Sequence, residues 1–507
     1  MLSALWLTPF LLHRLGQRDY GLWLVGLQIL AYLMLADFGI VALLPRTVAY
    51  ATGRAGGVTA TDLSPVIAQT MVIVLGQTVI VAGVSVLVWL FFPTDWLALR
   101  GPIGLVMAAF AVLFPMRMFG AILEGLQEQT FVIRANLFAW GIGTFANIVA
   151  VLAGLGLYAL AIGWVLSQAF TAGACSFRIY RHYREILPSR FPSISFSELR
   201  PQLGRGFWVS ASQLTQVMLG GFDVLIIGKV LGPASVVPYS CTGKLASVLS
   251  NQPVMLMHLA VPALSELKAE GSKERTYQTM TCLGQGMMLL SGAVFCVVLA
   301  VNQGFVRAWV GPDRYVGFTI TFLMLAEKLL RHLSLTFAYA IFCFGYERRM
   351  AISALLDGVV TTSAIATLTP LLGYRGAVVG SILGVCFVSL PVTMVTLARE
   401  LQVHVASLVS PLLPWLWRFA ILVVASSVFA RICNPQTFAQ TVALGGLITV
   451  GYGAVLLPAA MRMGIGPYLR SALIHFQGVI KGSSFNTVSA RLQSVGVSSD
   501  EPDNEGR

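Results

Sequence analysis

The sequence predicts an all-α protein that crosses a membrane about fourteen times. Of its 507 residues, 57% are hydrophobic and only 11% are charged, whereas a typical soluble domain has about 25% charged residues. The mean hydropathy is +0.80. Apolar runs of about 20 residues recur along the chain, and each can cross a hydrocarbon core of about 30 Å as a helix. The runs are continuous rather than alternating, which favours helices over the strands of a membrane barrel.

The apolar runs fall into two halves and a C-terminal pair. The first half is expected to hold six spans, at 1–13, 22–46, 65–92, 102–123, 132–153 and 157–177. The second half is expected to hold six more, at 207–229, 238–261, 280–301, 316–344, 351–371 and 377–397. Two further spans are expected at 416–430 and 441–461. The predicted division is an N-terminal lobe at 1–177, a basic cytoplasmic loop at 178–206, a C-terminal lobe at 207–397, a linker with the last two helices at 398–462, and a cytoplasmic tail at 463–507.

Three local matches suggest that the second half is a copy of the first. The segment that starts at Gly156 parallels the one that starts at Gly373, at an offset of about 217. Leu15-Gly16 parallels Leu231-Gly232 at about 216, and Gly125 parallels Gly345 at about 220. The spans run in the same order with an even number in each half. The copies are therefore expected to be parallel repeats, related by an axis along the membrane normal.

The segments at the two ends depart from this pattern. The first apolar run, 1–13, is short for a membrane span, and we expect a helix that is either clipped at its start or tilted. The segment 401–415 is expected to form a short helix along the interface, and 464–481 a basic interfacial helix. The last dozen residues are acidic and are expected to be disordered.

The formal net charge of +12 is explained by topology. The basic residues lie mostly in short loops, and the positive-inside rule places those loops and both termini in the cytoplasm. No nucleic-acid partner is therefore expected. The seven cysteines show no CxxC spacing, so neither a metal site, a redox site nor a disulfide framework is expected.

The strongest candidate for a functional group of residues is Glu327, Lys328, Arg331 and His332, near the middle of the expected span 316–344. Ionisable groups at this depth cost free energy unless they pair or face a polar cavity. Helical spacing allows Glu327 to meet Arg331, and Lys328 to meet His332. Two cations against one anion leave a positive charge without a partner on the same helix. One hypothesis is a cavity that holds an anionic head group, and the alternative is a structural pair.

Further charged residues occur within or at the ends of the expected spans. Asp37 and Asp223 are candidates for proton or cation coupling, although each could also be the partner of a basic residue. Asp223 and Lys244 could pair with each other. Arg46 and Arg117 are candidates for the same cavity, and a snorkelling position is the alternative for Arg46. For Asp357 and Asn147, hydrogen bonding between helices is expected.

Motifs of enzymes are missing from the sequence, which contains no GxSxG, P-loop or HExxH. We therefore expect a protein that is not an enzyme and holds no cofactor or metal. Since a nucleotide-binding domain is also missing, transport would use an ion gradient or the gradient of the substrate. The many glycines, 49 in all, together with prolines in or near the spans, favour helices that bend.

Two motifs resemble a known family. The opening Thr8-Pro9 to Trp23, with Ala36-Asp37-Phe38-Gly39 and Leu44-Pro45-Arg46, is similar to the polysaccharide-biosynthesis transporters, the O-antigen and exopolysaccharide flippases of the MOP superfamily. The segment Phe222 to Gly232, with Tyr239 and Lys244, resembles their second-half signature. The resemblance covers about residues 1–460. Asp37, Arg46 and Asp223 match motif positions, whereas the cluster at 327–332 is no motif of the family.

The resemblance implies a MATE-like fold, in which two six-helix lobes form a V around a central cavity. It implies transport of a polyprenyl-diphosphate-linked oligosaccharide from the inner to the outer leaflet of the bacterial inner membrane. Cations in the cavity would attract the diphosphate while the lipid tail stays in the bilayer. It further implies Na⁺ or H⁺ as coupling ions, and a polysaccharide polymerase and chain-length proteins as partners.

Two other functions compete with this interpretation. A cation-coupled exporter of drugs or metabolites on the same fold would use the carboxylates Asp37, Asp223, Glu327 and Asp357. A glycan polymerase or ligase would need a large external loop, but the longest expected external loop, Asn302 to Tyr315, has about fourteen residues. The polymerase hypothesis is therefore the weakest of the three.

Overall fold

The computed structural model describes residues 2–55, 60–188, 196–270, 273–344, 346–433 and 435–462, together with residue 466. In these ranges all regular secondary structure is helical. Ten helical segments of the described chain are long and apolar enough to cross a membrane. The prediction of an all-α polytopic membrane protein is therefore confirmed. The exact number of fourteen spans stays a prediction.

The first half of the chain forms one group of helices. They are α1 (Leu2–Leu33), η1 (Met34–Asp37), α2 (Ile40–Ala55), α3 (Ala60–Leu90), η2 (Thr94–Trp96), α4 (Leu97–Leu113), η3 (Phe114–Met116), α5 (Arg117–Gly125), α6 (Gln129–Leu152) and α7 (Leu157–His182). The turn η4 (Arg184–Ile186) follows α7.

The second half begins with three long helices, α8 (Phe196–Val230), α9 (Pro233–Glu270) and α10 (Lys273–Val310). It continues with η5 (Pro312–Arg314), α11 (Phe318–Cys343), α12 (Glu347–Leu372), α13 (Tyr374–Gly384), the π-helical turn η6 (Val385–Ser389) and α14 (Leu390–Leu401). The last elements are α15 (Val405–Val409), η7 (Ser410–Leu412), α16 (Leu413–Cys433) and α17 (Phe438–Ala460). The short helix α15 and the turn η7 lie in 401–415, where a short helix was predicted.

The chain reverses direction at Gly16, within the element α1. Gly16 has φ 80° and ψ 167°, a conformation that is essentially restricted to glycine. The hydroxyl groups of Thr8 and Tyr20 lie 3.3 Å apart, whereas twelve residues of a continuous helix would separate them by about 18 Å. The element is therefore a hairpin of two helices, which agrees with the predicted separation of spans 1–13 and 22–46.

A second break, at Asp37–Gly39, contradicts the prediction of one continuous helix over 22–46. Phe38 and Gly39 adopt positive φ angles of 44° and 67°. The Asp37 carboxylate accepts a hydrogen bond from the Gly39 N–H at 2.9 Å, and Gln77 donates to the Asp37 carbonyl at 2.8 Å. A short acidic side chain that binds a nearby N–H competes with helical bonding, and this explains why the helix stops here.

The basic segment between the halves is more helical than the predicted loop. The helix α7 continues to His182, and α8 already begins at Phe196. Arg178 and Arg181 therefore lie on a helix rather than in a loop, because a helix does not have to end where its apolar residues end. The predicted interfacial helix at 464–481, residue 466 excepted, and the predicted disordered end lie outside the described residues.

Two of the three repeat matches have a counterpart in the backbone, and the third involves Gly345, which lies outside the described residues. In the first, Gly16 and Gly232 both have positive φ angles, 80° and 91°. The second is at Gly156 and Gly373. Gly156 precedes α7 with φ 55° and ψ −132°, and Gly373 precedes α13 with φ 60° and ψ −136°. Both glycines thus make the same turn between two antiparallel helices that pack closely. The turn supports a duplication at this position. The offset over the whole chain stays a prediction.

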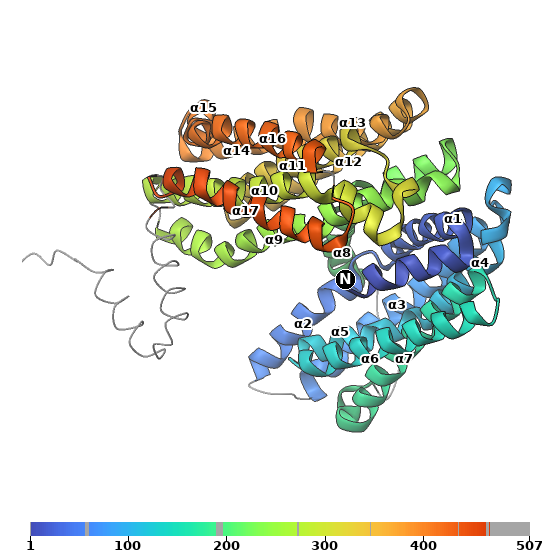
Figure 1. Ribbon diagram of the computed structural model, residues 1–507. Helices are drawn as coiled ribbons and strands as arrows, with labels where there is room; N and C mark the ends of the chain where they lie inside the picture. Colours follow the sequence, from blue (N-terminus) through green and yellow to red (C-terminus); the bar gives the residue numbers. More distant parts are fainter. Residues whose placement is uncertain are drawn as a thin grey trace, which may run out of the picture.

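The two groups of helices meet at one end of the molecule. At that end Gln17 donates to the Ala234 carbonyl at 2.9 Å, and Lys229 pairs with Asp95 at 2.6 Å. A Cβ atom on Gly21 would lie 2.0 Å from the Pro233 carbonyl oxygen, so only glycine allows this approach. Figure 1 shows the groups lying together near α1 and diverging toward α2 on one side and α9 and α10 on the other.

Candidate functional site

The predicted cluster on α11 forms as a set of ion pairs. Glu327 pairs with Arg331 one helical turn away and with the neighbouring Lys328, whose Nζ lies 3.1 Å from the carboxylate. Glu327 is buried, with 7% of its side chain exposed. The predicted contact between Glu327 and Arg331 is therefore confirmed.

Arg331 also has partners on two other helices. Its guanidinium lies 3.1 Å from the Asp357 carboxylate on α12 and donates to the Ser381 hydroxyl on α13 at 3.0 Å. Asp357 in turn accepts from Ser389 at 2.6 Å and from Thr361 at 2.9 Å. The partner that was missing on α11 is thus supplied by α12, and the four charged groups Glu327, Lys328, Arg331 and Asp357 balance to zero.

Lys328 and Arg331 differ in their exposure. Arg331 is 19% exposed and is held by two carboxylates and a serine. Lys328 is 38% exposed and has one carboxylate as its ion-pair partner among the described residues. A long, partly exposed ammonium group can reorient toward a ligand, whereas a guanidinium fixed by several partners cannot without leaving charges unpaired. Lys328 is therefore the cation of this cluster that is better placed to reach a ligand.

His332, the fourth residue of the predicted cluster, contacts α10. Its Nδ1 is 2.7 Å from the Ser291 hydroxyl on α10, and the side chain is buried. Among the described residues no hydrogen bond joins it to Lys328, although helical spacing allowed this contact. The ring connects α11 to α10.

Asp223 and Lys244, which were expected to be possible partners, form no ion pair in the described part of the chain. The carboxylate of Asp223 accepts from the Tyr239 hydroxyl at 2.6 Å and from the Val224 N–H at 2.9 Å. Lys244 lies half-buried on α9. Asp223 is consequently a carboxylate whose side-chain partner is neutral.

In the first half of the chain, Arg117 at the start of α5 faces Asp37 at the end of η1. The charged atoms are 3.8 Å apart, at the outer limit of an ion pair, with 34% of the arginine and 5% of the aspartate side chain exposed. The guanidinium also lies 5.6 Å from the ring centres of both Phe110 and Phe114. Its Nη1 atom is buried without a hydrogen-bond partner.

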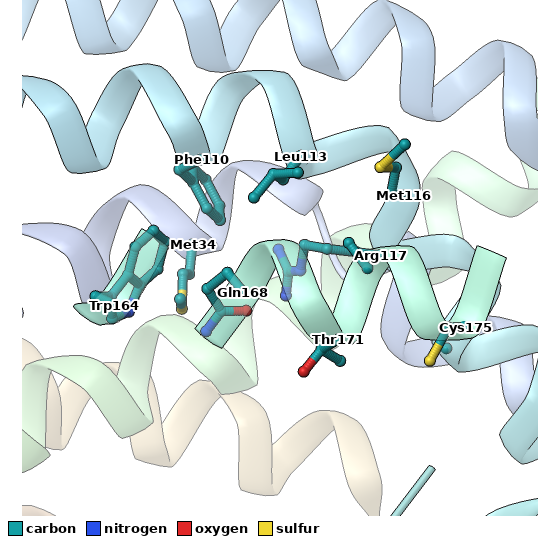
Figure 2. Close-up of a pocket in the computed structure, with 11 residues that line it drawn as sticks. Met34, Phe110, Leu113, Met116, Arg117, Trp164, Gln168, Thr171 and Cys175 are labelled. Atoms are coloured by element: carbon teal, nitrogen blue, oxygen red, sulfur yellow. The ribbon is translucent and has the colours of Figure 1, made fainter. Parts of the chain in front are cut away.

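A small pocket opens beside Arg117. Figure 2 shows the guanidinium pointing between Met34 and Gln168, with Trp164 and Phe110 at one end of the pocket. Its volume is about 70 Å³, which corresponds to about two water molecules. Trp164, Gln168, Thr171 and Cys175 line it from one face of α7, as expected for residues spaced by three or four along a helix.

Arg46 lies apart from these groups, exposed on α2. Its guanidinium donates to the Tyr50 hydroxyl at 3.3 Å and lies 5.4 Å from the centre of that ring. The structure thus places the predicted residues in three settings. Asp223 lies close enough to the α11 cluster for an electrostatic interaction with Lys328 and Glu327, whereas Asp37 with Arg117, and Arg46, form the other two. Sequence reasoning missed the hydroxyl groups around Asp357 and Arg331, at Ser381, Ser389 and Thr361, and the pocket residues Trp164 and Gln168.

Outside the membrane-spanning helices, Glu128 ties the α5–α6 connection to the end of α7. Its carboxylate accepts from Arg178 at 2.9 Å and from the Tyr183 hydroxyl at 2.8 Å. The hydrogen bonds from Arg178 and Tyr183 lower the pKa of Glu128 below its ordinary value. In the described residues no group of three or more histidine, cysteine or acidic side chains is arranged to hold a metal ion.

Comparison with known proteins identifies the family. Residues 29–311 match the family model described as polysaccharide biosynthesis protein, which covers more than half of the chain. The comparison with curated proteins gave no match.

Solved structures show the same fold. An inward-facing multidrug resistance MATE family transporter of the MOP superfamily is 14% identical, with a TM-score of 0.57 over 78% of this chain and 94% of that one. The lipid II flippase MurJ in its inward closed conformation is 9% identical, with a TM-score of 0.57 over 87% of this chain and 98% of that one. At these identities the similarity shows the fold alone.

The predicted fold class and family are both confirmed. The chain belongs to the polysaccharide biosynthesis protein family, and it adopts the fold of the MATE transporter and of MurJ.

Proposed function

We propose that this protein is a flippase that moves a polyprenyl-diphosphate-linked oligosaccharide from the inner to the outer leaflet by alternating access. The observation that carries the proposal is the presence of two partly exposed cations, Arg117 and Lys328. Arg117 lies within a candidate membrane span, and Lys328 lies on a helix between two candidate spans. Cations at such positions are costly unless they pair or serve a polar cavity or a ligand. Each of these two faces one carboxylate among the described residues and still keeps about a third of its side chain exposed. A diphosphate linker is the part of a lipid-linked sugar that such cations would attract.

The family and the fold support a lipid-linked cargo. The family model is described as a polysaccharide biosynthesis protein, and one similar structure is named a lipid II flippase. A transporter of this kind needs a polar route for the sugars, while the prenyl tail can remain among the exposed apolar side chains that face the bilayer. In this proposal the protein binds and releases its cargo without chemical change.

The conformation of the structure fits one end of a transport cycle. The helix groups meet around Gln17, Asp95 and Lys229. If the N-terminus is cytoplasmic, as the distribution of basic residues predicts, this closed end faces outward and the structure is inward-facing. We propose the bacterial inner membrane as the location and cytoplasmic positions for both termini.

The two carboxylates proposed for ion coupling differ in their settings. Asp37 faces Arg117 at 3.8 Å, whereas Asp223 has the neutral Tyr239 as its side-chain partner. A carboxylate without a fixed cation is the better candidate to bind Na⁺ or H⁺ during transport. We therefore propose Asp223 as the first choice and Asp37 as the second. A polysaccharide polymerase and chain-length proteins are the proposed protein partners.

Deletion of the gene in its host tests the function at the level of the cell. The proposal predicts loss of surface polysaccharide, accumulation of the lipid-linked precursor in the inner leaflet, and unchanged sensitivity to drugs. Plasmid-borne wild-type protein and the Arg134→Ala variant, which removes an exposed arginine on α6, should restore the polysaccharide. Arg117→Ala with Lys328→Ala should not.

The competing function is a cation-coupled exporter of drugs or metabolites on the same fold, and the setting of Asp223 is the observation that favours it. That function predicts the opposite result of the deletion, with raised drug sensitivity and intact surface polysaccharide. It also predicts that Asp223→Asn abolishes activity while the variants of Arg117 and Lys328 retain it.

A further inference from the structure

The pocket beside Arg117 has the features of an anion-binding site. The guanidinium is partly exposed, and its Nη1 atom has no hydrogen-bond partner. Arginine can donate five N–H groups in a planar fork that matches phosphate or carboxylate oxygens. Here the described partners are an aspartate at 3.8 Å and the faces of two phenylalanine rings. Much of the donor capacity of Arg117 is therefore unused.

The walls of the pocket suit a group of mixed polarity. Trp164, Phe110 and Met34 provide apolar surface, while Gln168 and Thr171 provide an amide and a hydroxyl on the same side (Figure 2). A few polar groups set in an apolar lining are typical of sites for small ligands. The volume of about 70 Å³ suits one small polar group of a larger ligand rather than the whole ligand.

Asp37, the aspartate that faces Arg117, also stabilises the break in the second membrane helix. Asp37 holds the break between η1 and α2, because its Oδ1 accepts the N–H of Gly39. Its other oxygen, Oδ2, is the one that faces Arg117. At this break Phe38 adopts a left-handed conformation that is unfavourable for an aromatic residue. A change in the partner of Arg117 therefore acts directly on a strained point in the second membrane helix.

We infer that this pocket is an oxyanion subsite, in which a phosphate or carboxylate group of the cargo replaces Asp37 as the partner of Arg117. The inference rests on the proposed function and specifies where the charged part of the cargo binds. At 3.8 Å the Asp37 carboxylate is a weak occupant, and an oxyanion in the pocket would bind the free N–H groups at closer range. Released from Arg117, the Asp37 carboxylate keeps its bond to the Gly39 N–H, while Gln77 still donates to the Asp37 carbonyl, and the break can change its angle.

Two substitutions separate this inference from a merely structural ion pair. Asp37→Asn keeps an oxygen that can accept the N–H of Gly39 but removes the negative charge that competes for Arg117. If Asp37 is a placeholder, Asp37→Asn should raise the affinity for the anion by about two- to fivefold. If the pair were merely structural, the same substitution would lower the affinity or leave it unchanged.

The experiment measures binding to the full-length protein in nanodiscs by microscale thermophoresis, with three probes. They are polyprenyl diphosphate without sugar, the same lipid with a neutral oligosaccharide, and a free oligosaccharide that contains uronic acid. Arg117→Ala should weaken binding by about tenfold or more, and Arg117→Lys by less. The Arg134→Ala variant and the thermal melting of every variant serve as controls for surface charge and for folding.

The probes distinguish the two sources of the oxyanion. Effects of both substitutions on the two lipid probes assign the subsite to the diphosphate, and effects on the uronic acid probe alone assign it to an acidic sugar. Unchanged or lower affinity of Asp37→Asn for all probes would overturn the inference, and if the wild type flips its cargo, the proposed function would stand without it. A wild-type protein that binds none of the probes would contradict both.

Discussion

Lys328 and Arg331 lie on the same helix, one turn apart, yet the structure gives them different roles. Arg331 connects α11 to α12 and α13 through Asp357 and Ser381. Among the described residues Lys328 has Glu327 as its one ion-pair partner, and Lys328 is twice as exposed as Arg331, 38% against 19%. A loss of Lys328 leaves Glu327 paired with Arg331. A loss of Arg331 leaves the buried carboxylate of Asp357 without a cation.

This difference predicts unequal effects on stability. Breaking a buried ion pair by removing one partner typically costs about 3–5 kcal/mol, whereas an exposed pair contributes about 0–1 kcal/mol. Arg331→Ala should therefore lower the melting temperature of the purified protein by several degrees, and Lys328→Ala should lower it slightly. Differential scanning fluorimetry in detergent measures both.

A compensating variant controls this first prediction. Arg331→Met combined with Asp357→Asn removes the uncompensated carboxylate together with the arginine and leaves Glu327 paired with Lys328, and it should recover part of the melting temperature. Equal melting temperatures of Arg331→Ala and Lys328→Ala would contradict the assigned roles.

The sequence could predict only the local part of this cluster. The contact of Glu327 with Arg331 follows from helical spacing within one helix. Asp357 and Ser381 lie 26 and 50 residues from Arg331, and their approach depends on how α12 and α13 pack against α11. The sequence showed that one cation has no partner on α11 itself, and it could not show that the next helix supplies Asp357. The pairing of Arg117 with Asp37 was left open for the same reason.

Among the elements, the hairpin at Gly16 sets the position of the first two helices. Its backbone conformation is essentially restricted to glycine, and other residues pay about 1–3 kcal/mol there. Gly16→Ala should therefore lower the melting temperature. The matched control is Gly141→Ala on α6, where a Cβ atom meets nothing within 4 Å and a helical glycine is replaced by a better helix former. A melting temperature that is unchanged by Gly16→Ala would contradict the described turn.

The contact of Glu128 with Arg178 and Tyr183 predicts a pH dependence. Because the pKa of Glu128 is lowered in the folded protein, its contribution to stability is present above the unfolded value of about 4.3 and is lost as the pH falls through the lower folded pKa. Glu128→Gln should lower the melting temperature at pH 7.

The pH series supplies the control for this prediction. The difference in melting temperature between wild type and Glu128→Gln should shrink as the pH is lowered from 5 toward 3, since both proteins then carry a neutral side chain there. Thermal melting over this range measures it. A difference that stays constant with pH would show that the charge of Glu128 contributes nothing.

Hydrophobic runs predicted the existence and order of the helices better than their ends and breaks. The spans near 316–344 and 351–371 correspond closely to α11 and α12, because a run of about 20 apolar residues has few alternatives in a membrane. The break at Asp37–Gly39 was missed, since its apolar flanks continue the hydrophobic pattern. Its signal was present in the sequence as an aspartate two residues before a glycine.

For the whole molecule, alternating access requires that the closed end open when the other end closes. Asp95 and Lys229 mark the closed end, and Tyr50 on α2 and Met255 on α9 are exposed positions farther along the diverging groups. Spin labels at 95 and 229 should move apart when cargo is added in proteoliposomes, while labels at 50 and 255 should approach each other.

Double electron–electron resonance measures these distances, after Cys433, an exposed cysteine, is replaced by serine. Both side chains of the Asp95–Lys229 pair are exposed. Replacing them with spin labels should therefore lower the stability by about 0–1 kcal/mol and leave the fold intact. Distances that increase at both ends, or that change at neither, would contradict alternating access.

Flipping of a polyprenyl-diphosphate-linked oligosaccharide in proteoliposomes, followed with an impermeant probe for the sugar, tests the proposed function directly. We expect wild type and Arg134→Ala to move sugar to the far face, and Arg117→Ala with Lys328→Ala to reduce the rate by about tenfold or more while the protein remains folded. A folded wild-type protein that moves no sugar, or a double variant that flips at the wild-type rate, would contradict the proposal.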